Sequence, residues 1–321
     1  AQSSSGYHAR ILMVSKALPL QIHRLPFKAM GSACEVVLAS HTQNEAESMA
    51  KLAIDEVLRI ERKYSRYTTD SVIAKINQQA GRGALQCDDE TWALFQFASQ
   101  LFDKSDGLFD ITSGVLRQAW DFKKPEVPTS QKLEALLPLV GWQNVVLQDQ
   151  SIALPLAGME VDLGGFGKEY AADRAAQVLK EKGVTHGYVN LAGDMRFLGP
   201  KSTGEPWMIG IQDPRARDQV VATLPITQGG LATSGDYERY FELNGQRYCH
   251  VLNPKTGMPV SYWRSVSVTS PATVVSGCTT TMAMLKEADG LAFLQATGFD
   301  FFAIDHTGKV HLRQETQAAL N

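Results

Sequence analysis

Two stretches of the chain carry apolar residues at intervals of three and four, the spacing that places them on one face of a helix. The first follows Thr42 or Asn44, either of which can cap a helix, and runs through about Lys63. Its apolar face consists of Met49, Ala50, Ala53, Ile54, Val57, Leu58 and Ile60. The second helix is expected from Asp89 to Lys104, and its aromatic residues are interpreted as core rather than as a cofactor site.

Short apolar runs, typical of strands, occupy much of the remaining chain. Residues 25–39 are interpreted as one strand, and residues 301–305 and 309–312 as a hairpin across His306-Thr-Gly. Further strand-like runs are 145–147, 151–154, 160–163, 187–191, 208–212, 220–226, 266–270 and 283–285. Because these runs neither alternate regularly with helices nor occur without them, the pattern predicts an α+β fold with mostly antiparallel sheets and packed helices.

A glycine-rich turn joins one of these runs directly to a third helix. Residues 161–173 read Val-Asp-Leu-Gly-Gly-Phe-Gly-Lys-Glu-Tyr-Ala-Ala-Asp. The strand-like run ends at Asp162, the glycines at 164, 165 and 167 are expected to allow a tight backbone path, and helical spacing continues to Gly183. Since free N–H groups and the helix dipole favour an anion at a helix start, phosphate is the natural occupant of this turn.

Two familiar phosphate-binding motifs do not fit this turn. A dinucleotide fingerprint would need a glycine at Tyr170, and a P-loop would need Ser or Thr at Glu169. Taken alone, the segment is equally compatible with a plain glycine-rich connection between a strand and a helix.

The composition is that of an ordinary globular protein, with 321 residues, 44% hydrophobic and 20% charged. A net charge of -3 gives no general attraction to nucleic acid or to an anionic membrane, so neither is an expected partner. The four cysteines are too far apart for a CxxC motif, and they allow three disulfide pairings that the sequence cannot rank. We expect a polar extension over residues 1–20 and a single domain over residues 21–321.

Among the histidines, His250 is the most attractive acid–base candidate. It precedes an Asn-Pro turn, where a neutral imidazole can accept a proton from a hydroxyl near neutral pH. The alternative for His250 is a structural hydrogen-bonding role. Tyr67 similarly either stacks on a ring-shaped ligand or forms part of an amphipathic surface.

Two further polar groups have both a functional and a structural interpretation. Asp110 and Thr112 follow a glycine-aromatic run and either face a ligand or cap a helix that starts near Val115. The threonines at 279–281 either supply a metal or phosphate ligand or hydrogen-bond back to a preceding helical turn.

The order of the polar motifs along the chain resembles that of the ApbE family, the FAD:protein FMN transferases. The motifs are Met30-Gly31, Ser65-Arg-Tyr67 with Ser71 and Asn77, Gly107-Leu-Phe-Asp-Ile-Thr112, Asp162-Leu-Gly-Gly-Phe-Gly-Lys168, Asn190-Leu-Ala-Gly-Asp194, Thr233-Ser-Gly-Asp-Tyr237 and His250-Val-Leu-Asn-Pro-Lys-Thr-Gly257. The resemblance implies a T-fold-like α+β core, FAD in a cleft, and magnesium-dependent transfer of FMN from FAD to a threonine of an acceptor protein with release of AMP. It also implies an exported, usually periplasmic enzyme, with membrane attachment only through a lipid anchor.

The resemblance also assigns roles to individual residues. His250 matches the catalytic histidine and is expected to contact the flavin nucleotide. The other expected FAD-binding residues are Met30, Tyr67, Asp110, Ile111, Thr112, Gly164, Gly165, Lys168 and Asp236. An FAD-binding protein without transferase activity and an FAD pyrophosphatase, which would release FMN and AMP, stay open as alternatives.

The expected magnesium site departs from the family pattern. The resemblance places a backbone carbonyl at Gly167 and a threonine ligand at Thr281, but Gly277 stands where it places an aspartate. Glu169, where the family usually has glycine, is the nearest candidate replacement by sequence, although its position is already explained by the helix dipole. Because Mg²⁺ prefers anionic oxygen ligands, we expect weak or absent magnesium binding rather than compensation by Glu169.

Overall fold

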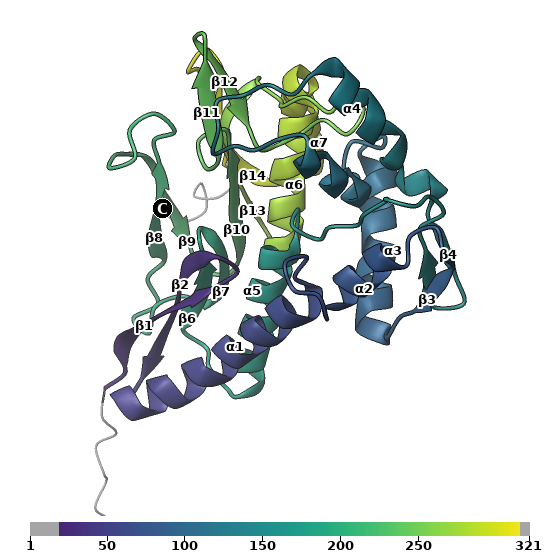
Figure 1. Cartoon of the computed structure of the whole chain (residues 1–321). Coiled ribbons are helices and arrows are strands. Elements are labelled where there is room, and N and C mark those ends of the chain that lie inside the picture. Colours follow the sequence, from purple (N-terminus) through teal and green to yellow (C-terminus); the bar gives the residue numbers. More distant parts are fainter. Residues whose placement is uncertain (1–18, 315–321) are drawn as a thin grey trace, which may run out of the picture.

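An eight-stranded antiparallel sheet organises the computed structural model of this protein, which describes residues 19–314 (Figure 1). The extension predicted for residues 1–20 therefore lies almost wholly outside the described residues. In spatial order the strands are β1 (Gln21–Ala29), β2 (Ser32–Ser40), β6 (Gly187–Leu191), β7 (Asp194–Gly199), β10 (Gly229–Gly235), β13 (Trp263–Ser270), β14 (Asp300–Asp305) and β15 (Val310–Arg313). Every neighbouring pair is antiparallel, which confirms the predicted α+β class with antiparallel sheets.

Three helices cover one face of this sheet: α1 (Gln43–Tyr64), α5 (Gly167–Glu181) and α6 (Thr273–Leu285) (Figure 1). The structure confirms the predicted α1, which begins with a capping box in which the side chains of Thr42 and Glu45 each accept a backbone N–H of the other residue. The alanines of α5 face α1 and the sheet, and their small side chains let the helices approach closely.

A smaller helical layer lies beyond α1 and α5. Its longest helix, α3 (Asp89–Lys104), has the predicted bounds and is capped by Asp88. The layer also contains α2 (Val72–Gln78), α4 (Ser130–Leu136), the 3-10 helices η1 (Ile111–Gln118), η2 (Leu137–Leu139) and η3 (Trp142–Asn144), and a small sheet of β3 (Ala84–Gln86), β5 (Ser151–Ala153) and β4 (Val146–Gln148). Near the C-terminus, η4 (Glu287–Asp289) and α7 (Gly290–Thr297) follow α6.

Two hairpins extend from the large sheet. The hairpin of β8 (Trp207–Gln212) and β9 (Val220–Ile226) packs on the face opposite α1 and α5, where Trp207 meets Tyr188 edge to face. The hairpin of β11 (Tyr240–Leu243) and β12 (Gln246–Cys249) leads directly into His250. Figure 1 shows β8–β9 on one side of the large sheet and α6 on the other.

The structure corrects the single strand predicted for residues 25–39, which forms a hairpin instead. The chain turns at Met30 and Gly31, whose φ angles are +51° and +69°, and β1 then pairs with β2. Positive φ at two successive residues is the backbone geometry of a tight hairpin turn. A methionine rarely adopts it, which is why the sequence pattern did not reveal the turn.

Other strand predictions were also wrong. Residues 283–285 end helix α6, and residues 160–163 form an extended segment without a strand partner. Strands β3, β7, β10, β11 and β12 were not predicted. The predicted hairpin near the C-terminus forms, as β14 and β15. The one-domain organisation of residues 21–321 stays a prediction.

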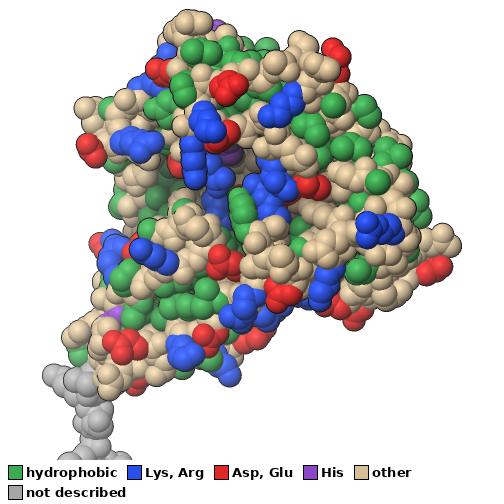
Figure 2. Space-filling model, viewed as in Figure 1, with side chains coloured by type: hydrophobic (Ala, Val, Ile, Leu, Met, Phe, Trp, Pro, Cys, Tyr) green, Lys and Arg blue, Asp and Glu red, His purple; other side chains and the backbone are tan. Residues whose placement is uncertain are grey.

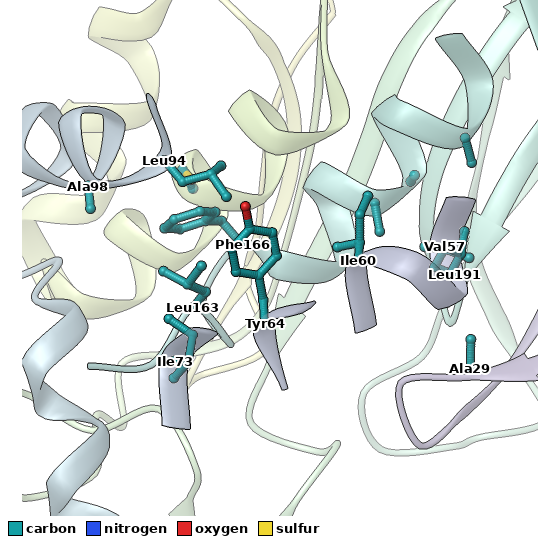
Figure 3. Close-up of a cluster of buried hydrophobic side chains, with 14 of the residues drawn as sticks. Ala29, Val57, Ile60, Tyr64, Ile73, Leu94, Ala98, Leu163, Phe166 and Leu191 are labelled. Atoms are coloured by element: carbon teal, nitrogen blue, oxygen red, sulfur yellow. The ribbon is translucent and has the colours of Figure 1, made fainter. Parts of the chain in front are cut away.

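The glycine-rich turn is anchored in the core by its apolar residues. Figure 3 shows Leu163 and Phe166 together with Tyr64, Ile73 and Leu94, from helices on either side. Both side chains are almost fully buried, with exposed fractions of 3% and 0%. Burial of two such side chains contributes about 3–6 kcal/mol to folding, so the turn is held rigidly.

Two general features concern the whole described part of the chain. The four cysteines are buried free thiols, so none of the three disulfide pairings is formed. Within residues 19–314, no helix has the length and apolar character that a membrane crossing requires.

Candidate functional site

The glycine-rich turn presents the start of helix α5 to open space. No side chain within residues 19–314 caps this helix, because its N-cap residue is the buried Phe166. None of Gly164, Gly165 and Gly167 has a positive φ, so the path of this turn does not depend on left-handed backbone. Position 165 favours glycine because a Cβ there would lie 3.1 Å from the ring of Phe109. A Cβ at position 167 would have no atom within 4 Å. The space beside the Gly167 Cα is therefore open, although its N–H already donates to the carbonyl of Leu163 at 2.7 Å.

The next residue, Lys168, contributes a buried ion pair at the same place. Its Nζ lies 2.9 Å from Oδ2 of Asp194, the first residue of β7, whose exposed fraction is 4%. Burial alone would lower the pKa of Lys168, but the carboxylates of Asp194 and Glu169 raise it, so the ammonium group stays charged. The structure thus places a fixed positive charge at an uncapped helix N-terminus, which is the arrangement that binds phosphate.

The neighbouring Glu169 points into the protein and lies against Gly277 of α6. A Cβ at position 277 would lie only 2.4 Å from Oε1 of Glu169. The Glu169 side chain is 8% exposed, and its Oε2 has no hydrogen-bond partner in the described part of the chain. Burial, followed by the negative charge of Asp194, raises the pKa of this carboxyl group well above its usual value.

The threonines of α6 fall into two groups. Thr279 and Thr280 donate to the carbonyl oxygens of Val275 and Gly277 at 2.7 and 2.9 Å, the helical back-bonding given above as the structural alternative. Thr281 is half-buried, and its hydroxyl lies 3.4 Å from that of Ser234 on β10. It stands one helical turn after Gly277, on the same face of α6.

His250 lies at the end of β12 with its ring largely buried. Its backbone N–H donates to the carbonyl of Arg239 at 3.0 Å, while the ring Nδ1 is buried and has no partner among the described residues. Burial and then the charge of Arg239 lower the pKa of His250 to about 4. The imidazole is therefore neutral at pH 7, and because the charge of Lys168 also acts on it, the two residues lie near each other.

Tyr67 is held beside the glycine-rich turn by an arginine. Arg66 pairs with Asp162 and donates to the Tyr67 hydroxyl at 3.0 Å, while Asp162 accepts the Gly164 N–H at 3.0 Å. The Tyr67 side chain is 78% exposed, and the charge of Arg239 acts on it as on His250. Figure 2 shows a hollow in one face of the molecule, ringed by Lys and Arg side chains, with a histidine visible inside.

The segment from Asp110 to Thr112 is locked by internal hydrogen bonds. Asp110 accepts the N–H and hydroxyl of Thr112 at 2.7 and 2.6 Å and the N–H of Trp142 at 3.0 Å. Asp110 caps the helix η1, which is the structural role considered above, although η1 begins at Ile111 rather than near Val115. The carbonyl of Ile111 accepts the Asp162 N–H. The segment borders a cavity of about 450 Å³, which Pro254 also lines.

Asp236 and Met30 are positioned by other contacts. Both carboxylate oxygens of the buried Asp236 accept hydrogen bonds from Arg215 at 2.7 Å, and Arg247 lies 3.3 Å from one of them. The Met30 N–H donates to Glu61 at 2.7 Å. Their assignment as FAD-binding residues stays a prediction, and for Asp236 the occupied carboxylate favours an indirect role through the two arginines.

Several site residues were not identified from the sequence. Asp194, Asp162 and Arg66 lie inside the motifs quoted above, but the motifs gave no role to their side chains. Arg239, whose charge acts on both Tyr67 and His250, lies just beyond the Thr233–Tyr237 motif.

Taken together, an antiparallel α+β fold with an uncapped helix start, fixed cations, an exposed tyrosine and a neutral histidine defines a protein that binds an anionic ligand with an aromatic ring. More narrowly, the chain belongs to the ApbE family, whose model matches residues 30–303.

Individual relatives agree with this assignment. The chain is 30% identical over 253 residues to the FAD:protein FMN transferase of Vibrio cholerae, covering 76% of this chain and 75% of the relative. It is 33% identical over 236 residues to a Klebsiella pneumoniae protein of the same name, covering 72% of each. The crystal structure of the ApbE protein of Thermotoga maritima superposes with a TM-score of 0.84 at 30% identity, covering 92% of this chain and 97% of that one.

Proposed function

We propose that this chain is a FAD:protein FMN transferase, which moves FMN from FAD to an acceptor protein. The observation that carries the proposal is the convergence of Lys168 and the open start of α5 with the neutral His250 in an ApbE-family fold. The first two suit the diphosphate of FAD, and the histidine suits a hydroxyl group that attacks it.

The reaction is a phosphoryl transfer with a protein hydroxyl as nucleophile. We infer that a threonine oxygen of the acceptor attacks the phosphorus of the FMN moiety, a new P–O bond forms, and the P–O bond to AMP breaks. AMP leaves with the bonding electron pair. The proton of the hydroxyl passes to His250, whose low pKa is raised when an anionic diphosphate lies nearby.

The remaining residues bind and orient FAD. The Lys168 ammonium group and the positive end of the α5 dipole neutralise the charge of the diphosphate, and because Asp194 already holds the lysine, little reorganisation is needed on binding. Tyr67 presents an exposed ring, held by Arg66, on which the flavin or the adenine can stack.

In place of the weak or absent binding expected from the sequence, we propose magnesium as the second component of the site, because the oxygen donors present there suit this ion. Gly167 has a backbone carbonyl and open space beside its Cα, Thr281 a half-buried hydroxyl, and Glu169 a buried oxygen without a partner among residues 19–314. These hard oxygen donors suit Mg²⁺, which commonly binds through one or two carboxylates together with substrate phosphates. When bound, the ion would neutralise charge on the diphosphate.

The proposal is tested by incubating the purified chain with FAD, magnesium and a candidate acceptor domain. We expect AMP release to match the flavin that becomes bound to the acceptor through an acid-stable phosphoester on a threonine. Bound FAD without AMP would instead indicate a flavin-binding protein, and AMP with free FMN in equal amounts would indicate a pyrophosphatase.

Export to the periplasm and attachment through a lipid anchor are proposed from the family resemblance. Fractionation of cells that express the full-length gene tests both points: the protein should appear in the periplasmic or membrane fraction. Recovery in the cytoplasmic fraction would contradict the export.

A further inference from the structure

We infer that Glu169 of α5, together with Asp194 of β7, supplies the carboxylates that hold a divalent cation of the Mg²⁺ type in this protein, in place of a carboxylate on α6. This inference rests on the proposed function, since it concerns the same site. The inference concerns cation binding, however, which can be measured without FAD and separately from transfer activity.

The first argument is the unsatisfied oxygen of Glu169. The side chain is 92% buried, since only 8% is exposed, and Oε2 has no partner in the part of the chain that the structure describes. An unpaired carboxylate oxygen inside a protein costs about 1–3 kcal/mol or more, so such groups persist where a ligand completes them. A metal ion bound at this oxygen would remove the cost.

The second argument is the balance of charge. Glu169 and Asp194 are close enough for each negative charge to disfavour the other, and one ammonium group, that of Lys168, faces both. The carboxylate of the nearby Asp173 accepts the N–H groups of Thr273 and Val274 and pairs with an arginine, so it adds no unpaired charge to this group. Lys168 pairs with Asp194, so an ionised Glu169 needs a second positive charge, which a bound cation would supply.

The third argument is the packing of Glu169 on Gly277. The Gly277 backbone is helical and has no positive φ, so conformation does not require glycine there. Space does, because a Cβ would lie within 2.8 Å of three atoms of the Glu169 side chain. Position 277 and position 169 therefore compete for one volume, and in this chain the carboxylate in that volume comes from α5.

Neutral oxygen donors surround the same volume. Thr281 follows Gly277 by one helical turn and contacts Ser234 of β10, and the N–H of the adjacent Thr233 bonds to Asp194. In residues 19–314 no three His, Cys, Asp or Glu side chains cluster as a metal site. A site of two carboxylates completed by hydroxyl groups, water and ligand phosphates is the arrangement that suits Mg²⁺ rather than zinc.

The test is a titration with Mn²⁺, used as the probe ion, in which electron paramagnetic resonance measures the free metal in the absence of FAD. The native chain should bind Mn²⁺, and Glu169→Gln, which keeps the shape but removes the charge, should weaken binding at least about tenfold. Glu181→Gln is the matched control, because Glu181 is an exposed acid on the same helix and should leave binding unchanged.

A double variant makes the test specific for the shared volume. Glu169→Gly combined with Gly277→Asp returns a carboxylate to that volume from the other helix and should restore binding close to the native value. Gly277→Asp alone should not tighten binding, because Glu169 already occupies the space. Thermal unfolding of each variant shows that it is folded.

Two results would overturn the inference. One is a native chain that leaves all Mn²⁺ free, and the other is a folded Glu169→Gln variant that binds as tightly as the native chain. Quenching of FAD fluorescence in the presence of chelator is measured in parallel. Loss of Mn²⁺ binding with FAD binding intact separates this inference from the proposed function, whereas failure of FAD to bind the native chain would count against the latter.

Discussion

Two buried carboxyl groups, those of Asp110 and Glu169, differ in their hydrogen bonds. Asp110 is 7% exposed and Glu169 8%, and burial raises the pKa of both. Asp110 receives three hydrogen bonds from Thr112 and Trp142, whereas Oε2 of Glu169 receives none from the described residues. The comparison indicates that a buried acid whose partners lie within the protein stabilises the fold, while one without them marks a place for a ligand.

His250 belongs with Glu169 in this comparison, because its buried Nδ1 also lacks a partner within residues 19–314. His250→Ala should lower the transfer rate by about a hundredfold to ten-thousandfold, the contribution of a positioned acid–base group, while FAD still binds. Single-turnover rates and a separate FAD titration check this, and an equal loss of rate and affinity would show that the histidine binds FAD rather than acting on the hydroxyl.

The next largest effect is expected on the stability of the protein when Asp110, the hydrogen-bonded acid, is replaced. Asp110→Ala should destabilise the protein by about 2–5 kcal/mol, because it leaves three buried donors without an acceptor. Urea unfolding measures this free energy. Asp110→Asn is the control and should lose less, since its amide oxygen still accepts. A fully stable Asp110→Ala variant with lost FAD affinity would instead make Asp110 a ligand-binding residue.

The low pKa of His250 predicts a pH dependence of stability. Its ordinary pKa is 6.5 and its folded-state pKa about 4, so between these values the unfolded chain binds a proton that the folded chain does not. The folded state therefore loses stability as the pH falls from about 6.5 to about 4. The stability of His250→Gln should fall less steeply in that window, as measured by unfolding at each pH, and parallel curves would contradict the lowered pKa.

A smaller effect of opposite sign is expected at Glu169. Without metal, Glu169→Gln should stabilise the protein at neutral pH by roughly 1 kcal/mol, because it removes a buried carboxyl group with an unpaired oxygen. Calorimetry in chelator measures the change in Tm, with Glu181→Gln as the exposed control. A decrease in Tm as large as that of Asp110→Ala would place the two acids in one structural class.

Much of the helical fold could be predicted from the sequence, and the reasons are local. Helices α1 and α3 combine an apolar face with a capping residue, Thr42 or Asp88, within one short segment. Helix α6 was missed because it is buried on nearly all sides and rich in β-branched threonine and valine, so it has no helical periodicity and a strand-like composition. The turn at Met30 was missed because only its second residue is glycine.

The site could be predicted in part. The glycine-rich turn, Tyr67 and His250 each stand in a recognisable local motif, and their roles stay predictions. In the structure Arg66 joins Tyr67 to the turn, and the charge of Arg239 acts on both Tyr67 and His250. The contact of Glu169 with Gly277, and that of Lys168 with Asp194, join elements far apart in the chain. The family resemblance places an aspartate at position 277, and only the packing of α5 on α6 shows that the side chain of Glu169 lies against Gly277.

The most direct test of the central claim is a crystal structure of the chain soaked with FAD and Mn²⁺, with the anomalous signal of manganese recorded. The account predicts the diphosphate against Lys168 and the start of α5, and a manganese peak beside the carboxylates of Glu169 and Asp194. A diphosphate bound at the Asp110–Thr112 segment, with manganese away from Glu169, would contradict it.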